Sequence, residues 1–355
     1  MALCATVGAI PAGAATAPVG EVYVADVDSG TISQFGADAH GNLAALPVPS
    51  VAVAGAPDHV LVSPNGKYVY VLNCGAGAVD QFAVVMSGTG KGELTPMTVA
   101  AVPTVPCAED RHTDTQRVLA ETHSGKFVFA LAQSLSGDVT LQEFAVGKGG
   151  ALTPTATLPT GLHNPASLVI TPNGKFVYLL DGTGNMTVFS VDKKGIPATV
   201  APAHPFDTCP TDATITANGK TMYVVEQCNG TLSTLHLNSD GTLTLLGLNI
   251  HGCPREVTVT PNNKNVYVAD ACASPVIFQY RAFSDGVLTE QIPFSVPSAT
   301  VLAMAPSVNG KALYVTIDNG MQNLDTYPID IHGLLTAPAA LSSTGLGSWG
   351  IAYRK

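Results

Sequence analysis

Oxygen-bearing side chains stand directly after five similar apolar segments of the sequence. The segments include VYVAD, VYVLN, VYLLD and YVVE, and they end at Asp26, Asn73, Asp181, Glu226 and Asp270. Three more acids, Asp58, Asp212 and Glu256, stand just before apolar runs. Carboxylate and amide oxygens can hold Ca²⁺ or a cationic ligand, and a carboxylate can act as a general base.

These residues therefore form a predicted ligand-binding set: Asp26, Asn73, Asp181, Asp212, Glu226, Glu256 and Asp270. Three of them are the candidates for catalysis: Asp212, Glu226 and Glu256. The alternative is structural, because Asp and Asn at strand ends commonly hydrogen-bond their own turns. No metal ligands are assigned, and a calcium ion is considered only where the acids converge.

Two pairs of cysteines predict disulfides. Cys209 and Cys228 each lie nine residues from the turn Asn218-Gly219, and Cys253 and Cys272 each lie nine residues from Asn262-Asn263. Residues equidistant from a two-residue turn face one another, with Cα atoms roughly 4.5–5.5 Å apart, which suits a disulfide. Cys74 and Cys107 form a third predicted pair. The alternatives are buried free thiols or zinc, but the spacing is not that of CxxC zinc motifs.

The elements that carry these residues repeat along the chain. Six copies of one segment read SPNGKYVYVL, THSGKFVFAL, TPNGKFVYLL, TANGKTMYVV, TPNNKNVYVA and SVNGKALYVT. Asn-Gly between apolar runs predicts a two-residue type I′ turn joining two strands. Two further strands follow each copy, and their lysines are 44–59 residues apart. A period near 40–50 residues with four strands predicts a β-propeller.

A seventh blade is predicted from the two ends of the chain. Residues 20–48 contain three strands without an innermost one, and GSWGIAYRK at the C-terminus supplies an innermost strand alone. Pairing the ends closes the ring and leaves no open sheet edge. The prediction is an all-β, seven-bladed β-propeller of four antiparallel strands per blade, in one domain over residues 20–355.

Composition bounds the class of protein. Hydrophobic residues make up 46% of the chain and charged residues 12%, which argues against disorder. With 16 Lys+Arg, 26 Asp+Glu and no basic run, a nucleic-acid partner is excluded. No segment is long and apolar enough for a membrane span. Residues 1–19 are small and apolar, and they predict either the remnant of a secretory signal or a flexible tail.

The repeats and the shared terminal blade resemble the lactonase-like seven-bladed propeller family, which includes propeller-type 6-phosphogluconolactonases and secreted YVTN-repeat proteins. The site residues that the resemblance implies are largely replaced. The family's His-x-His falls on Asn164-Pro165-Ala166, its Pro-Arg-His on Pro210-Thr211-Asp212, and its Asp-Ile-His on Glu256-Val257-Thr258. A phosphorylated lactone needs cations and a base, so hydrolysis of 6-phosphogluconolactone is not expected.

The sequence thus predicts a non-catalytic propeller that binds a small molecule or a protein on its loop-bearing face, the face of the ring on which the links between blades lie. One alternative is a hydrolase for a lactone without phosphate, and another is a structural component of the cell envelope. The disulfides predict a secreted, periplasmic or envelope location. A monomer is expected.

Overall fold

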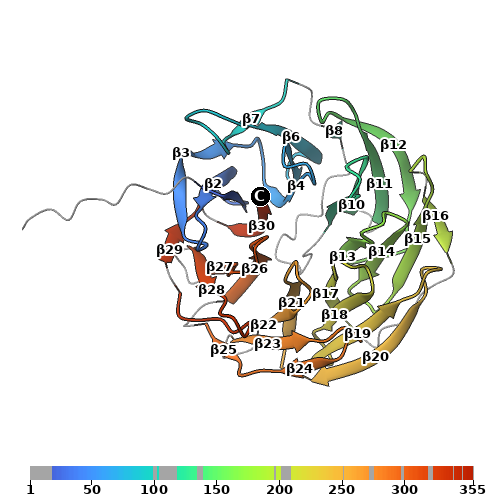
Figure 1. The fold of residues 1–355 in the computed structure, drawn as a ribbon. Coiled ribbons are helices and arrows are strands. Elements are labelled where there is room, and N and C mark those ends of the chain that lie inside the picture. The colour runs from blue at the N-terminus through green and yellow to red at the C-terminus, as the bar shows by residue number, and fades with distance from the viewer. Residues whose placement is uncertain are drawn as a thin grey trace, which may run out of the picture.

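The computed structural model is a ring of seven antiparallel blades around a central axis (Figure 1). It describes residues 18–98, 102–103, 118–133, 139–195, 197–200, 209–250, 252–271, 276–296, 300–318, 323–338, 340–345 and 347–354. These ranges fold as strands joined by turns. None of them forms a helix long and apolar enough to cross a membrane. The predicted fold class is confirmed.

Each blade has an innermost strand beside the axis and three strands further out. From the inside outwards, blade 1 consists of β30 (Ser348–Arg354), β1 (Gly20–Asp26), β2 (Thr31–Ala37) and β3 (Leu43–Ala52). Blade 2 consists of β4 (Pro57–Val62), β5 (Tyr68–Asn73), β6 (Ala78–Val84) and β7 (Leu94–Pro96), with β8 (Val102–Pro103) also paired to β6. Blade 3 consists of β9 (Leu119–Glu121), β10 (Phe127–Gln133), β11 (Val139–Val146) and β12 (Leu152–Pro159).

The remaining four blades follow in chain order. Blade 4 consists of β13 (Pro165–Ile170), β14 (Phe176–Asp181), β15 (Met186–Val191) and β16 (Pro197–Val200), and blade 5 of β17 (Pro210–Ile215), β18 (Thr221–Glu226), β19 (Thr231–Leu237) and β20 (Leu243–Ile250). Blade 6 consists of β21 (Pro254–Val259), β22 (Asn265–Asp270), β23 (Val276–Ala282) and β24 (Leu288–Glu290), with β25 (Phe294–Ser295) also paired to β23. Blade 7 consists of β26 (Thr300–Pro306), β27 (Ala312–Asp318), β28 (Asn323–Pro328) and β29 (Ala340–Ser343).

The C-terminal strand completes blade 1, as predicted. β30 pairs antiparallel with β1, and its C-terminus lies near the centre of the ring (Figure 1). The buried guanidinium of Arg354 forms an ion pair with the buried carboxylate of Glu21 and donates to the carbonyl of Gly66 in blade 2. The rings of Tyr314 and Tyr353 stack 5.7 Å apart between blades 7 and 1. Side-chain contacts thus join β30 to both neighbouring blades.

The hairpin turns differ from the predicted type I′. In blade 5, four residues separate Thr216 from Thr221, and Gly219 has a φ of +68° whereas Asn218 is not in the left-handed region. Thr216 Oγ1 accepts the N–H of Thr221, and Asn218 Oδ1 accepts the N–H of Lys220. The asparagine therefore acts through its side chain, and its backbone does not need a positive φ. A two-residue turn was the wrong prediction.

Tyrosines on the second strands of blades 1, 2, 4 and 6 join these blades to the next. Their hydroxyls donate to the carbonyl of a glycine in the turn between the third and fourth strands of the following blade, and burial raises their pKa. The bonds are Tyr23 to Gly92, Tyr70 to Gly150, Tyr178 to Gly241 and Tyr267 to Gly333, at 2.6–2.9 Å. A Cβ at position 241 would lie 2.6 Å from the ring of Phe176, so the close approach requires glycine.

Candidate functional site

A β-bulge lies near the start of six of the described innermost strands. The register shifts between Pro57 and His59, Pro165 and Ser167, Pro210 and Asp212, Pro254 and Glu256, and Val301 and Ala303, and β30 has the same extra residue. The inserted residues are Asp58, Ala166, Thr211, Arg255, Leu302 and Trp349. Bulges re-aim side chains beside functional sites, so this end of the channel is the candidate mouth.

The residue after the bulge ties its blade to the next one in blades 4, 5 and 6. Each of these side chains accepts a backbone N–H from the neighbouring innermost strand. The bonds are Ala213 N–H to Ser167 Oγ at 3.3 Å, Val257 N–H to Asp212 Oδ2 at 3.1 Å and Met304 N–H to Glu256 Oε1 at 2.8 Å. These polar side chains therefore hold three blade junctions together at the mouth.

Asp212 is the most enclosed of these acids. It is fully buried, and Ser167 Oγ donates to its second oxygen, Oδ1, at 3.2 Å. Both carboxylate oxygens thus have partners within the ring of blades. Glu256 is 4% exposed and contributes to the channel wall. Of these two acids, only Glu256 contributes to the described channel lining.

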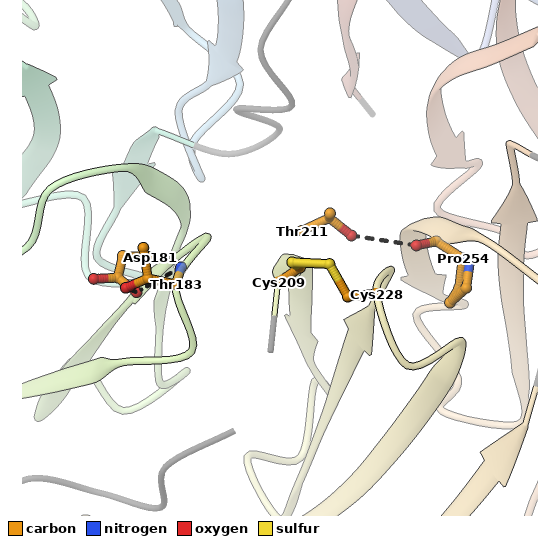
Figure 2. The surroundings of a disulfide bond; sticks show 6 residues. All are labelled: Asp181, Thr183, Cys209, Thr211, Cys228 and Pro254. Carbon is orange, nitrogen blue, oxygen red and sulfur yellow. Dashed lines mark hydrogen bonds between the residues drawn. A yellow bond between two sulfur atoms is a disulfide. The ribbon is translucent and has the colours of Figure 1, made fainter. Parts of the chain in front are cut away.

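The five side chains that end the second strands are also buried, at most 4% exposed. Asp181 Oδ1 accepts a bond from the backbone N–H of Thr183 in its own turn, at 3.0 Å (Figure 2), and another from the N–H of Asn185 at 2.9 Å. Asn73 Oδ1 accepts the N–H groups of Ala56 and Ala76, both at 3.0 Å. These bonds are of the structural kind that the sequence left open as the alternative.

The other three strand-end acids have comparable partners. Asp26 accepts the hydroxyls of Ser33 and Ser348 at 2.7 and 2.8 Å, and burial raises the pKa of its carboxyl. Glu226 Oε1 accepts the hydroxyl of Ser233 at 2.5 Å. Asp270 Oδ2 accepts the N–H of Cys253 at 2.8 Å. Ligand binding by these acids remains a prediction.

A central channel with a volume of about 460 Å³ runs between the innermost strands. All seven of these strands contribute to its wall. Its ionisable side chains include His59 and Glu256 near the bulges and Glu121 at the far end of β9. Burial raises the pKa of Glu121 to about 8. Glu121 was not predicted as a site residue. The sequence does contain a signal for it, because the matching positions of other copies, Val62 and Ile170, are apolar.

Arg255 was not among the predicted site residues. It occupies the bulge of β21, is 9% exposed, and precedes Glu256. Its position on the innermost strand corresponds to that of Thr211 in blade 5. Both residues follow a Cys-Pro pair, and both are the inserted residue of the bulge in their strand. The resemblance matched Pro-Arg-His to blade 5, but its first two residues are found here in blade 6. The sequence shows Arg255 after Pro254, but it was set aside because blade 6 is not the blade in which the family carries Pro-Arg-His.

The mouth lacks the basic turn residues. The six turn lysines lie at the opposite end of the blades, beyond the last residues of the innermost strands: Lys67, Lys126, Lys175, Lys220, Lys264 and Lys311. Asp26, Asp181, Asp212, Glu226, Glu256 and Asp270 lie toward the mouth. The described residues of the mouth are therefore predominantly acidic.

The disulfide between Cys209 and Cys228 is confirmed, with Cα atoms 5.5 Å apart (Figure 2). The cysteines do not face each other in the ladder as predicted. The bulge at Thr211 shifts the register, so that the N–H of Gln227 bonds the carbonyl of Cys209 at 3.0 Å. Thr211 Oγ1 donates to the carbonyl of Pro254 at 3.4 Å, between blades 5 and 6 (Figure 2).

Cys74 and Cys253 are disulfide-bonded as well. Their predicted partners, Cys107 and Cys272, lie outside the described residues. Within the described ranges, no three His, Cys, Asp or Glu side chains are grouped so that they could hold a metal ion. The calcium site stays a prediction.

Residues 13–200 match the family model described as lactonase, 7-bladed beta-propeller. The chain belongs to this family. A 6-phosphogluconolactonase of Serratia proteamaculans is 27% identical over 227 residues, which cover 58% of this chain and 65% of that protein. The match therefore spans less than two thirds of the relative.

Solved structures share the fold of this lactonase-family propeller. The periplasmic gluconolactonase PpgL of Pseudomonas aeruginosa is 16% identical, with a TM-score of 0.76 over 95% of this chain and 99% of that one. A protein of Lactobacillus plantarum is 14% identical, with a TM-score of 0.77 over the same shares. At these identities the likeness concerns the fold alone, and the family resemblance drawn from the repeats is confirmed.

Proposed function

We propose that this lactonase-family propeller hydrolyses a lactone without a phosphate group at the mouth of its channel. The observation that carries the proposal is the pair Arg255-Glu256 at the bulge of β21. It places an arginine next in the chain to Glu256, whose side chain belongs to the channel wall. The acids elsewhere at the mouth disfavour a phosphate by like-charge repulsion.

In the proposed reaction the Glu256 carboxylate takes a proton from a water, whose oxygen attacks the lactone carbonyl carbon. The guanidinium of Arg255 stabilises the oxyanion of the tetrahedral intermediate. The bond between that carbon and the ring oxygen then breaks, and the ring oxygen receives the proton from Glu256. The product is an open-chain hydroxy acid. The bond from Met304 to Glu256 Oε1 supports the role by fixing the carboxylate.

The disulfide supports a place outside the cytoplasm, because disulfides persist in oxidising compartments. We therefore assign the protein to a secreted, periplasmic or envelope location. A second function, binding of a neutral ligand without turnover, is favoured by one specific observation: both oxygens of Asp212 are engaged in structural bonds. That leaves fewer carboxylates for chemistry than the sequence suggests.

The experiment compares hydrolysis of glucono-1,5-lactone and its 6-phosphate by the full chain with its disulfides intact, after subtraction of the spontaneous rate. We expect turnover of the first and little of the second. Glu256→Gln should lower kcat by about 10²–10⁴-fold. Glutamine keeps an acceptor for the N–H of Met304, so the strand is preserved.

The matched control is Glu143→Gln, a buried carboxylate on β11 that bonds Thr155 away from the mouth. It should leave kcat unchanged. Wild-type activity on the phosphorylated lactone that exceeds activity on the neutral one would contradict the proposal, and so would full activity of Glu256→Gln. Binding of the neutral lactone without turnover would favour the second function.

A further inference from the structure

The channel is deeper than one lactone ring at the mouth requires. Its wall extends from Glu256, the first paired residue beyond the bulge of β21, to Glu121, the last residue of β9. Glu121 pairs with Val128 in blade 3 as Val259 pairs with Val266 in blade 6, so Glu121 and Val259 occupy equivalent positions on their innermost strands. It therefore lies three residues deeper than Glu256, which is about 10 Å along a strand.

The walls of the deeper part suit a ligand with many hydroxyl groups. Each innermost strand lies at the end of its sheet, so one of its edges has no strand partner and presents N–H and C=O groups. The hydroxyl-bearing side chains of Thr214 and Thr258 also belong to the wall. A hydrocarbon chain would leave the N–H and C=O groups of these strand edges without hydrogen bonds, at a cost in free energy.

Glu121 adds a polar group at the deep end. Its Oε2 is buried and has no hydrogen-bond partner among the residues that the structure describes. Desolvation raises its pKa to about 8, so near neutral pH the group is mainly an uncharged carboxylic acid. Such a group offers one O–H donor as well as acceptor oxygens. The pKa of the nearby Tyr70 phenol is raised by burial and by the Glu121 carboxyl, and its hydroxyl donates to the carbonyl of Gly150.

We propose that the channel below the mouth binds a second polyhydroxylated ring, so that the preferred substrate is the lactone of a neutral disaccharide. Its lactone ring lies beside Glu256 and its second ring extends toward Glu121. The volume of about 460 Å³ is within the range of pockets that enclose a drug-sized ligand. The position of the lactone ring rests on the proposed function, whereas the second-ring site rests on the channel itself.

The first test compares kcat/KM for cellobiono-1,5-lactone and glucono-1,5-lactone. We expect at least a tenfold advantage for the two-ring lactone, mostly in KM. Glu121→Leu should remove this advantage and leave the one-ring lactone unaffected. Ala120→Phe, which narrows the channel at the preceding residue of β9, should do the same. Thermal melting controls for folding, and Glu121→Leu should not lower Tm because it removes a buried carboxyl.

The second test does not depend on turnover. Calorimetry with cellobiitol, which has no lactone, should show binding to the wild type and to Glu256→Gln, and about tenfold weaker binding to Glu121→Leu. If no lactone is hydrolysed but this pattern holds, the proposed function fails and the channel site stands. If glucono-1,5-lactone is hydrolysed but cellobiitol does not bind, or Glu121→Leu binds it equally well, the channel site is overturned.

Discussion

At the scale of single residues, burial changes what the acids of this propeller do. The sequence places Asp212 and Glu256 on one face of the ring and suggests ligand binding. The structure adds their partners, which come from the next blade more than forty residues away. No local pattern specifies such a partner, since it depends on how neighbouring blades pack. The positions of these acids were therefore predictable, and their inter-blade bonds were not.

Removal of the Asp212 side chain should weaken the junctions on both sides of blade 5. Asp212→Ala leaves the N–H of Val257 and the hydroxyl of Ser167 without this acceptor. We expect a loss of about 1–3 kcal/mol in the free energy of unfolding. Denaturant unfolding at constant ionic strength measures it.

Asp212→Asn is the matched control, because the amide keeps one oxygen for Val257 and can donate to Ser167. It should cost less than Asp212→Ala. Equal stability of the alanine variant and the wild type would show that these bonds contribute nothing.

The buried carboxyls also predict how stability depends on pH. Burial raises the pKa of Glu121 to about 8, and the pKa values of Asp26, Asp80, Glu143 and Asp325 are raised as well. Unfolded carboxyls titrate near about 4, so the folded state binds more protons between about pH 4 and 8. Stability should therefore fall as the pH rises through that window.

Melting between pH 5 and pH 8 measures this dependence. The wild type should have its higher Tm at pH 5, and Glu121→Gln should lose less stability on going to pH 8. Glu290→Gln, at an exposed position, should behave as the wild type does. A wild-type Tm that rises toward pH 8 would refute the assignment.

At the scale of elements, the hairpin turns show which part of a motif carries the structure. The repeated Ser/Thr-x-Asn-Gly-Lys correctly located every hairpin that contains it. The threonine or serine hydroxyl organises the loop, and in blade 6 Asn263 takes the left-handed conformation, with a φ of 59°, that glycine has elsewhere. Hairpins were thus predictable from the pattern, but the loop length was not, because side-chain bonds stabilise a longer turn.

The threonine can be tested in blade 4. Thr171 Oγ1 accepts the N–H of Phe176 at 3.0 Å and donates to Asn173 Oδ1 at 2.8 Å. Thr171→Val keeps the shape and removes both bonds, and it should cost about 1–3 kcal/mol of unfolding free energy. Thr153→Val, at an exposed position on β12, should cost almost nothing. Equal effects of the two substitutions would contradict the role of the hydroxyl.

The disulfides are the second feature of the elements that spacing predicts. Peptide mapping without reductant should recover Cys209 linked to Cys228, and we expect Cys253–Cys272 and Cys74–Cys107 in the same digest. Replacing Cys209 and Cys228 together by alanine should cost about 3 kcal/mol, because the crosslink closes a loop of 19 residues. Full alkylation of all seven cysteines before reduction would contradict the pairing.

At the scale of the whole molecule, the ring depends on a pair of buried charges in blade 1. Arg354→Met leaves the carboxylate of Glu21 buried without its cation, and we expect a loss of about 3–5 kcal/mol in unfolding free energy. The double variant Glu21→Leu/Arg354→Met should recover most of it. Denaturant unfolding of the two single variants and the double variant completes the cycle. A double variant as unstable as Arg354→Met would mean that the bond from Arg354 to Gly66 matters more.

The tyrosines that bridge successive blades give the ring a built-in optical reporter. Burial raises their pKa above the value of a free phenol, and it also raises the pKa of Tyr223, a further buried tyrosine on the second strand of blade 5, to about 12. In moderately alkaline solution these phenols therefore stay un-ionised only while the blades around them remain closed. A rise in tyrosinate absorbance would follow the opening of the seams between blades in real time, without any label attached to the protein.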